Sequence, residues 1–217
     1  MNKHHCLSPL RRKILLGWAS GAVLAATGGL SLVLYKDQSW VNSPHYSTNE
    51  TKKSKTLVVV YSRSGNTLIA AKEAAGVFQA DLLNIVTDDY PLNIMGQLRA
   101  MRDALNLSSI SNIQYSQFNT GEYDKFILCS PVWMFRPAIP IWAFVKASDF
   151  SQKSVYLLMT GNSKYEEKNI TLFSEQIKHS NGFFSGYDFI ERGRALWQLS
   201  SEELQLKVNE VIKDRFF

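Results

Sequence analysis

The sequence predicts an α/β protein with three layers, in which helices cover both faces of a parallel sheet. Two observations support this prediction. Short apolar segments alternate with helical patterns from Thr56 to the C-terminus. The first of them, Thr56–Tyr61, is a continuous and largely β-branched run, which is typical of a strand buried on both faces. Right-handed crossovers between such strands place the intervening helices on both sides of the sheet.

Five strands are expected, each followed by a helix. The strands are predicted at Thr56–Tyr61, Asp81–Val86, Asp124–Cys129, Ser154–Met159 and Phe183–Ile190. The first, third and fourth helices are predicted at 66–78, 139–147 and about 168–178. The apolar faces of the other two helices are marked by Ile94, Leu98, Met101 and Leu105, and by Leu204, Val208, Val211 and Ile212, which recur at helical spacing.

The loops after the first, third and fourth strands are where a ligand is expected. In open parallel sheets, ligands bind beyond the carboxyl ends of the strands, where the strand order reverses. The first of these loops is Ser62-Arg63-Ser64-Gly65-Asn66-Thr67. Its three hydroxyls and the N–H groups of the following helix would suit a phosphate, and its glycine permits close approach of the backbone. Arg63 either adds charge or points to solvent; the alternative for the whole segment is a plain Ser/Thr helix cap.

This loop resembles the Ser/Thr-x-Thr-Gly-x-Thr phosphate loop of flavodoxins, and Tyr-Ser-Arg-Ser-Gly-Asn-Thr is similar to the bacterial flavodoxin-like branch. The resemblance covers most of residues 56–217 in element order. It implies a flavodoxin-like fold with strand order 2-1-3-4-5 and FMN as the cofactor. The glycine-rich and lysine-containing motifs of other nucleotide-binding loops are absent from this turn.

The other two loops supply the residues that the resemblance places around the flavin ring. After the third strand, Ser130-Pro131-Val132-Trp133-Met134-Phe135 resembles the family's Gly/Ser-x-Pro-x-Trp loop, and Trp133 is expected to stack on the ring. Trp133 packing on the domain's own helices is the alternative. After the fourth strand, Thr160-Gly161-Asn162 and Tyr165 are expected at the pyrimidine edge, with an ordinary turn as the alternative.

Two features depart from the family pattern. Flavodoxins often carry a glycine in the loop after the third strand, which permits a peptide flip toward flavin N5 when the semiquinone forms. The stretch Ser130–Phe135 contains no glycine, so strong stabilisation of that form is not expected. Flavodoxins are also strongly acidic, whereas this domain is close to neutral, which weakens charge steering toward a basic partner.

The charge distribution argues against a nucleic-acid-binding role. Of 24 Lys/Arg and 19 Asp/Glu, eight and two precede Thr56, which leaves sixteen and seventeen in the domain. The excess of positive charge therefore lies in the leader. The two cysteines, Cys6 and Cys129, form no disulfide framework, and Cys129 is expected to be a small buried hydrophobe. No metal-ligand spacing and no hydrolytic triad or carboxylate pair is present, so no catalytic residue is predicted.

The N-terminal 35 residues are predicted to direct the chain to a membrane. Arg11-Arg12-Lys13 precedes the uncharged segment Ile14–Tyr35. The arginine pair and the residues that follow it resemble a twin-arginine (Tat) signal, although Leu10 stands where that motif prefers Ser or Thr. A Sec signal and a plain anchor are the alternatives. The segment is long enough to span a bilayer. Residues 36–55 are polar and read as a tether with a typical reach of roughly 25 Å.

These observations together predict an FMN-binding electron-transfer domain, residues 56–217, that is periplasmic or anchored at the outer face of a bacterial inner membrane. Its partner would be a redox protein or a quinone. Tat export supports this reading, because it carries folded, cofactor-loaded proteins. The alternatives are an NAD(P)H-dependent quinone or flavin oxidoreductase, and a flavin-free binding module that kept the fold.

Overall fold

The computed structural model describes residues 54–107, 112–162, 164–193 and 197–216. It contains six strands: β1 Thr56–Tyr61, β2 Asp81–Ile85, β3 Lys125–Trp133, β4 Arg136–Pro137, β5 Ser154–Gly161 and β6 Phe183–Glu191. Its helices are α2 Asn66–Phe78, α3 Ile94–Asn106, α4 Ile139–Ala147, α5 Glu167–His179 and α6 Ser201–Phe216, with a short 3-10 turn, η1, at Thr120–Glu122. The predicted leader, 1–35, and the tether up to residue 53 lie outside the described residues.

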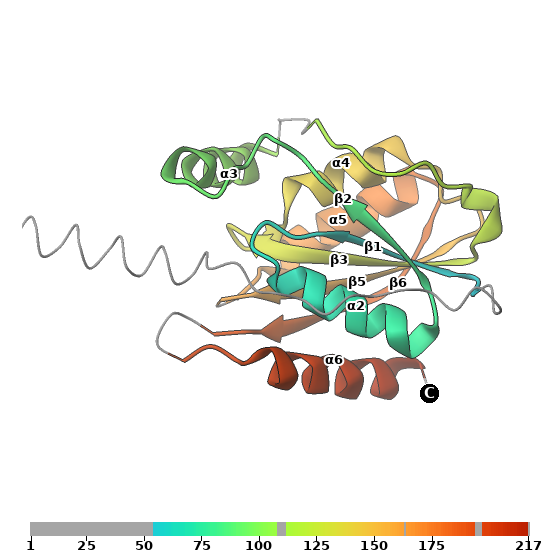
Figure 1. Ribbon diagram of the computed structural model, residues 1–217. Coiled ribbons are helices and arrows are strands. Elements are labelled where there is room, and N and C mark those ends of the chain that lie inside the picture. Colours follow the sequence, from blue (N-terminus) through green and yellow to red (C-terminus); the bar gives the residue numbers. More distant parts are fainter. Residues whose placement is uncertain (1–53, 108–111, 163, 194–196, 217) are drawn as a thin grey trace, which may run out of the picture. The chain divides into compact units, whose positions relative to one another are not determined.

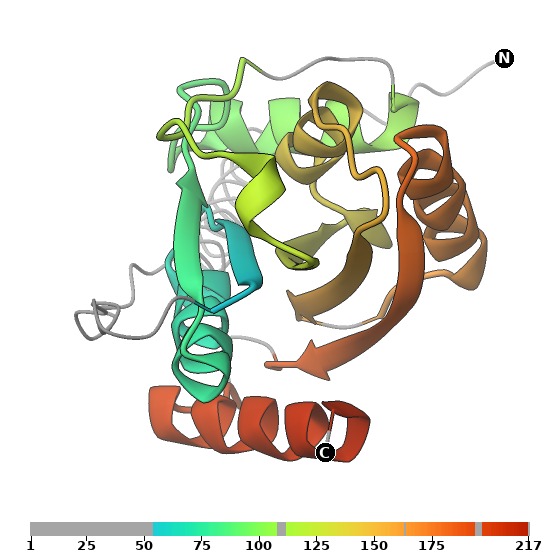
Figure 2. The ribbon, with the colours of Figure 1, turned by 90° about the vertical axis from the view of Figure 1, so that its right-hand side faces the viewer.

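The predicted fold is confirmed. Five parallel strands run in the order β2-β1-β3-β5-β6, which corresponds to the expected 2-1-3-4-5 order. The sheet is sandwiched between helices on its two faces (Figure 1). Figure 2 shows α2 and α6 side by side on one face. Among the described residues, none of the helices has the length and apolar character needed to cross a lipid bilayer.

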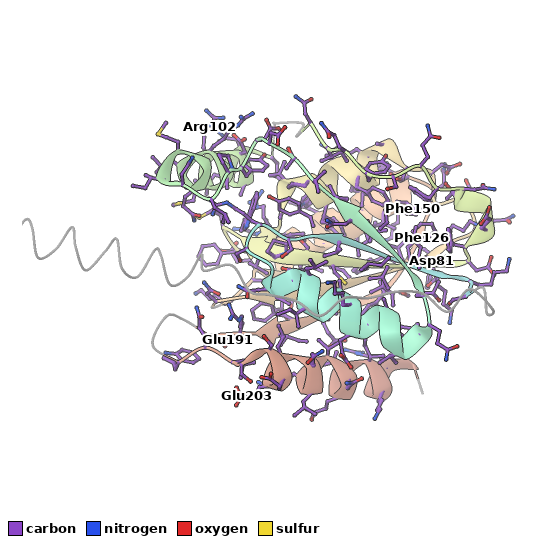
Figure 3. The ribbon with its side chains drawn as sticks, in the orientation of Figure 1. Asp81, Arg102, Phe126, Phe150, Glu191 and Glu203 are labelled. Atoms are coloured by element: carbon purple, nitrogen blue, oxygen red, sulfur yellow. The ribbon has the colours of Figure 1, made fainter. Side chains whose placement is uncertain are left out.

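Two apolar cores fill the spaces between the layers. Successive residues of β1 alternate between them, because neighbouring side chains of a strand point to opposite faces. Val58 and Val60 pack toward α2 and α6, whereas Leu57 and Val59 belong to the core beneath α4 and α5. The second core is rich in aromatic rings, such as the edge-to-face pair of Phe126 and Phe150 with centroids 5.0 Å apart (Figure 3).

Cys129 is fully buried in the core of α2 and α6, as predicted, and it is a free thiol. Burial raises the pKa of this thiol, because the thiolate would lose its hydration there. The side chain is therefore an inert part of the packing rather than a reactive group.

The third strand is longer than predicted, and this corrects one boundary. The sequence pattern ends it at Cys129, but β3 continues to Trp133 and folds back on β4 as an antiparallel hairpin. Val132 pairs with Pro137, and Trp133 pairs with Arg136. Only Met134 and Phe135 form the turn. The pattern misses this hairpin because neither turn residue is one that favours the required left-handed backbone.

Helix α3 differs from the others in how it packs. The buried residues of α3 are Gly96, Ala100, Asp103 and Ala104. The stripe that marks this helix in the sequence, Ile94, Leu98, Met101 and Leu105, is exposed instead. The helix therefore contacts the domain through its small residues. In Figure 1 it lies at the end of the domain where the β1–α2 turn is found.

Candidate functional site

The turn between β1 and α2 has the backbone and the donors of an anion site. Gly65 is the N-cap of α2, with φ +92° in the left-handed region, and no side chain caps the helix. The first N–H groups of a helix have no partner within it and carry the positive end of its dipole. The Ser62 oxygen accepts from the N–H of the N-cap residue Gly65 itself, but no side-chain cap bond reaches the helical residues that follow, so a Ser/Thr helix cap does not describe this turn.

The two serine hydroxyls of the turn act as acceptors in the hydrogen bonds of the structure. The Ser62 oxygen accepts from the Gly65 N–H at 3.1 Å, and the Ser64 oxygen accepts from the Asn66 amide at 3.2 Å. A hydroxyl that accepts one bond still has its own O–H to donate. The Asn66 Oδ1 atom is buried and has no partner among the described residues.

Thr67 joins this turn to the end of β5. Its hydroxyl lies 2.8 Å from the hydroxyl of Thr160, and both side chains are buried. Thr160 belongs to the predicted third loop, so the structure brings two of the three predicted segments into direct contact. Thr160 is also paired in register with Pro131 of β3. The three segments therefore meet at one edge of the sheet.

Arg63 neither reaches into this turn nor points to solvent. Its guanidinium donates to the carbonyls of Tyr90, Pro91 and Asn93 at 3.1, 2.6 and 3.2 Å, and to the Gln97 side chain. Desolvation lowers the pKa of this guanidinium, although an arginine remains charged. The sequence cannot indicate this role, because the acceptors lie 27 to 34 positions away.

Trp133 lies against the rings of two tyrosines, Tyr61 and Tyr90. Its ring meets the ring of Tyr61 at 5.5 Å and that of Tyr90 at 4.9 Å, in both cases edge to face. The tyrosines are buried, whereas Trp133 is only half-buried. Part of its surface is therefore open to a flat ring. Burial raises the pKa of both tyrosine hydroxyls, which keeps them neutral.

The sequence does not predict that Tyr61 and Tyr90 contact Trp133. Tyr61 has a usable signal, since it is the last residue of β1 and directly precedes the phosphate-type turn. Tyr90 has none, because it lies in the β2–α3 connection and reaches Trp133 only through the tertiary fold.

The β3–β4 turn is held by bonds from α5 and the residue before it. The Phe135 carbonyl accepts from the Glu166 N–H at 2.9 Å and from the Asn169 side chain at 3.0 Å. The φ angles of Met134 and Phe135 are +45° and +67°, a conformation that costs a residue with a Cβ about 1–2 kcal/mol. Lys164 lies over the Phe135 ring, 5.6 Å from its centroid.

Other predicted residues have roles within the fold. The buried Ser130 hydroxyl accepts from the Ala138 N–H at 2.8 Å and donates to the Pro131 carbonyl, which fixes the base of the hairpin. Tyr165 packs edge to face on Phe189 and Tyr187 of β6.

Gly161, at the end of β5, lies close to Val132 of β3. A Cβ added to Gly161 would lie 3.1 Å from the Val132 Cβ and 3.0 Å from the Phe189 ring. Glycine therefore lets the end of β5 approach the hairpin closely. Asn162 follows at the exit of the strand and is half-buried.

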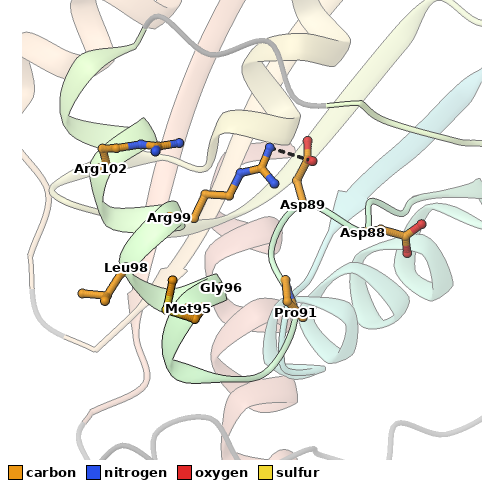
Figure 4. A pocket seen from close by; sticks show the side chains of 8 residues that line it. All are labelled: Asp88, Asp89, Pro91, Met95, Gly96, Leu98, Arg99 and Arg102. Atoms are coloured by element: carbon orange, nitrogen blue, oxygen red, sulfur yellow. Dashed lines mark ion pairs between the residues drawn. The ribbon is translucent and has the colours of Figure 1, made fainter.

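A hollow of about 510 Å³ lies beside this site, between α3 and the connection that precedes it. Figure 4 shows Arg99 reaching across it to Asp89, with a distance of 2.8 Å between the charged groups. The lining residues are Asp88, Asp89, Pro91, Met95, Gly96, Leu98, Arg99 and Arg102.

Comparison with solved structures supports the fold. The chain is 20% identical to a flavoprotein from Lactobacillus acidophilus NCFM solved in complex with FMN, with a TM-score of 0.54; the match covers 63% of this chain and 93% of that one. Flavoproteins of Bacteroides eggerthii and Bacteroides uniformis match with a TM-score of 0.59 each, at 17% and 20% identity, and cover 76% and 73% of this chain and 99% of their own.

Comparison with protein families is more specific. No curated protein matches the sequence. The flavodoxin family model matches residues 55–184, which is more than half of the chain and includes the β1–α2 turn, the hairpin and the end of β5. The protein therefore belongs to the flavodoxin family.

Proposed function

We propose that this protein binds FMN at the carboxyl edge of its sheet and transfers electrons between partners at the outer face of a bacterial inner membrane. The observation that carries the cofactor assignment is the β1–α2 turn, in which hydroxyl donors and an uncapped helix N-terminus converge around Gly65. These groups fit a phosphate dianion, because it accepts several hydrogen bonds and favours the positive end of a helix dipole.

Different residues near the turn would contact different parts of FMN. Ser62, Ser64 and Thr67 would hold the phosphate. Trp133 would stack on the isoalloxazine ring, since Tyr61 and Tyr90 fix its orientation. Thr160, Gly161 and Asn162 would border the pyrimidine edge, where the last residues of β5 approach the hairpin. Bound FMN would supply one- and two-electron chemistry, and the protein would supply binding and orientation.

The electron-carrier function is favoured over an enzymatic one by the proposed location, because pyridine nucleotides are scarce outside the cytoplasm. An NAD(P)H-dependent quinone or flavin oxidoreductase is the second candidate; the family supports both. Rapid bleaching of the flavin on stopped-flow mixing with NADPH would favour the enzyme and overturn the carrier.

The location at the membrane rests on the leader. The order of Arg11-Arg12-Lys13 and the uncharged segment 14–35 supports Tat export or anchoring, with the domain outside the cytoplasm. This location is tested by replacing Arg11 and Arg12 with lysine and fractionating the cells that express the variant. Export that is unchanged in this variant would overturn the Tat assignment.

The phosphate site is tested by comparing FMN with riboflavin, which lacks the phosphate. Ser62→Ala/Thr67→Ala removes two hydroxyls, each worth about 1.5–3 kcal/mol to a charged acceptor. FMN should therefore bind at least about 100-fold more weakly, while riboflavin affinity changes little. The matched control, Thr171→Ala/Ser174→Ala, removes the same groups from the exposed side of α5. Flavin fluorescence quenching measures the six affinities of the unmodified protein, the double variant and the control for the two flavins.

Unchanged FMN affinity would refute the assignment, and so would an equal loss of affinity for both flavins in a double variant that stays folded, because neither result depends on the phosphate. Thermal unfolding of each apoprotein, followed by circular dichroism, checks that the folded state persists. If unmodified protein quenches neither flavin, the flavin-free module is the correct reading.

A further inference from the structure

Helix α3 presents a continuous apolar face to the surroundings. We define the α3 face as the large side chains that are exposed on this helix and just before it. Met95 is 72% exposed and Leu98 is 55% exposed. Single exposed hydrophobic residues are ordinary, but a contiguous set of this kind marks an interaction site. The α3 face comprises Leu92, Ile94, Met95, Leu98, Met101 and Leu105.

The two arginines beside this face are paired with acids, whereas Asp88 on the preceding connection is exposed. Arg99 bonds to Asp89 at 2.8 Å and lies 3.7 Å from Asp103, and Arg102 bonds to Asp103 at 2.8 Å. Figure 4 shows the first of these pairs. The acid on the helix itself, Asp103, is buried. Because acids neutralise both arginines, these side chains give an acidic protein partner little electrostatic complementarity.

The predicted membrane leader bears on which partner this face could meet. It carries the uncharged segment Ile14–Tyr35 and a polar tether of about twenty residues. At about 3.3 Å per residue the extended tether reaches roughly 65 Å. A domain of this size has a radius of gyration of about 15 Å, so its diameter is roughly 40 Å. The tether is therefore long enough for any face of the domain to meet the membrane that holds the leader.

We propose that the α3 face docks on the lipid surface, with α3 lying in the plane of the membrane and its large apolar side chains in the interfacial layer. A helix with an apolar side and a polar side binds a bilayer in this way. The proposal rests on the proposed membrane location, and it adds an orientation. Arg63 bonds the phosphate-type turn to the start of α3, so docking would hold the flavin edge close to the lipid.

The experiment places an environment-sensitive fluorophore on this face. Full-length protein carrying Cys6→Ser is reconstituted in phosphatidylcholine vesicles, with Leu98→Cys labelled by a nitrobenzoxadiazole group. Cys129 is fully buried and stays unlabelled. The matched control is Leu206→Cys on α6, where the leucine is 69% exposed. Met101→Cys, also on the α3 face, serves as the second test variant.

Docking predicts a blue shift of the label at 98 and at 101, and loss of its fluorescence when spin-labelled phosphatidylcholine is included. The label at 206 should emit as it does in water and keep its intensity. Emission at 98 that equals emission at 206 would overturn the proposal. A blue shift without quenching by spin-labelled lipid would also overturn it, because the face would then be covered by a second copy or by the leader. FMN absorbance of the same samples reports separately on the proposed function.

Discussion

Arg63 offers the sharpest test of how the candidate site is held together. Its guanidinium donates three hydrogen bonds to the connection between β2 and α3 and one to Gln97 of α3, and that connection carries Tyr90 to the edge of Trp133. The change Arg63→Met keeps much of the side-chain length and removes every one of these donors. The carbonyls of Tyr90, Pro91 and Asn93 would then lose a charged partner.

The cost follows from the exposure of each bond. The bonds to the Tyr90 carbonyl and the Gln97 side chain are partly buried, whereas those to Pro91 and Asn93 are exposed. A hydrogen bond to a charged group contributes about 1.5–3 kcal/mol when it is shielded from water. Exposed polar pairs contribute between zero and about 1 kcal/mol. The free energy of unfolding should therefore fall by about 3 kcal/mol, which lowers the Tm by roughly 6–12 °C for a domain of this size.

The assay is urea and thermal unfolding of the apoprotein, because bound flavin would add its own stabilisation. Lys207→Met on α6 is the control, since it removes one exposed positive charge far from the site. FMN binding by Arg63→Met should weaken as well, as Tyr90 loses its support. If Arg63→Met and Lys207→Met unfold at the same temperature, Arg63 does not hold the connection in place and the reasoning fails.

Three further predictions follow from other features of the structure. Burial raises the pKa of Cys129 and of Tyr61. The folded state therefore holds these two protons more tightly than the unfolded state does. The free energy of unfolding is unaffected below the pKa values of the unfolded chain, and it falls as the pH rises above them. Urea unfolding should show stability falling above about pH 8.5–9, and in Cys129→Ala only above about pH 10; coincident pH profiles would contradict this. Thr160→Val should destabilise the apoprotein by about 1–3 kcal/mol, because it leaves the buried Thr67 hydroxyl unpaired; a double-mutant cycle with Thr67→Val that gives purely additive effects would argue against the pair. Met134→Gly should be more stable than Met134→Ala by about 1 kcal/mol, the reverse of the usual order; the usual order in thermal unfolding would show that no strain is stored there.

The sequence predicted those parts of the molecule that are governed by local pattern. The run of Thr56–Tyr61 and the start of α2 at Asn66 follow directly from β-branched residues and from the Gly65 turn. The fold follows from the alternation of strands and helices, since chirality and layering leave few arrangements of a parallel sheet. The position proposed for the candidate site rests on the same pattern, because the carboxyl ends of the strands meet at one edge.

The partners of individual site residues were not predictable in this way. Nothing near Arg63 in sequence shows that it bonds to the β2–α3 connection, and nothing near Trp133 identifies Tyr90 as its neighbour. The stripe of Ile94 and Leu98 correctly predicts a helix. It does not tell which way the helix faces, because an apolar side serves equally for packing on a sheet and for contact with something outside the domain.

The turn at Met134 and Phe135 shows why a site can contradict local preference. A two-residue hairpin turn with positive φ at both positions is of type I′, and it is normally made by Asn-Gly. Here it is imposed by the pairing of Val132 with Pro137 and by the bonds from Glu166 and Asn169 to the Phe135 carbonyl. Rotation of the central peptide would move Met134 into a region that only glycine adopts readily, and it would strain those bonds. The hairpin beside the predicted flavin is therefore set in advance by the fold. Its influence on the cofactor must come from fixed contacts rather than from a backbone movement such as a glycine would allow.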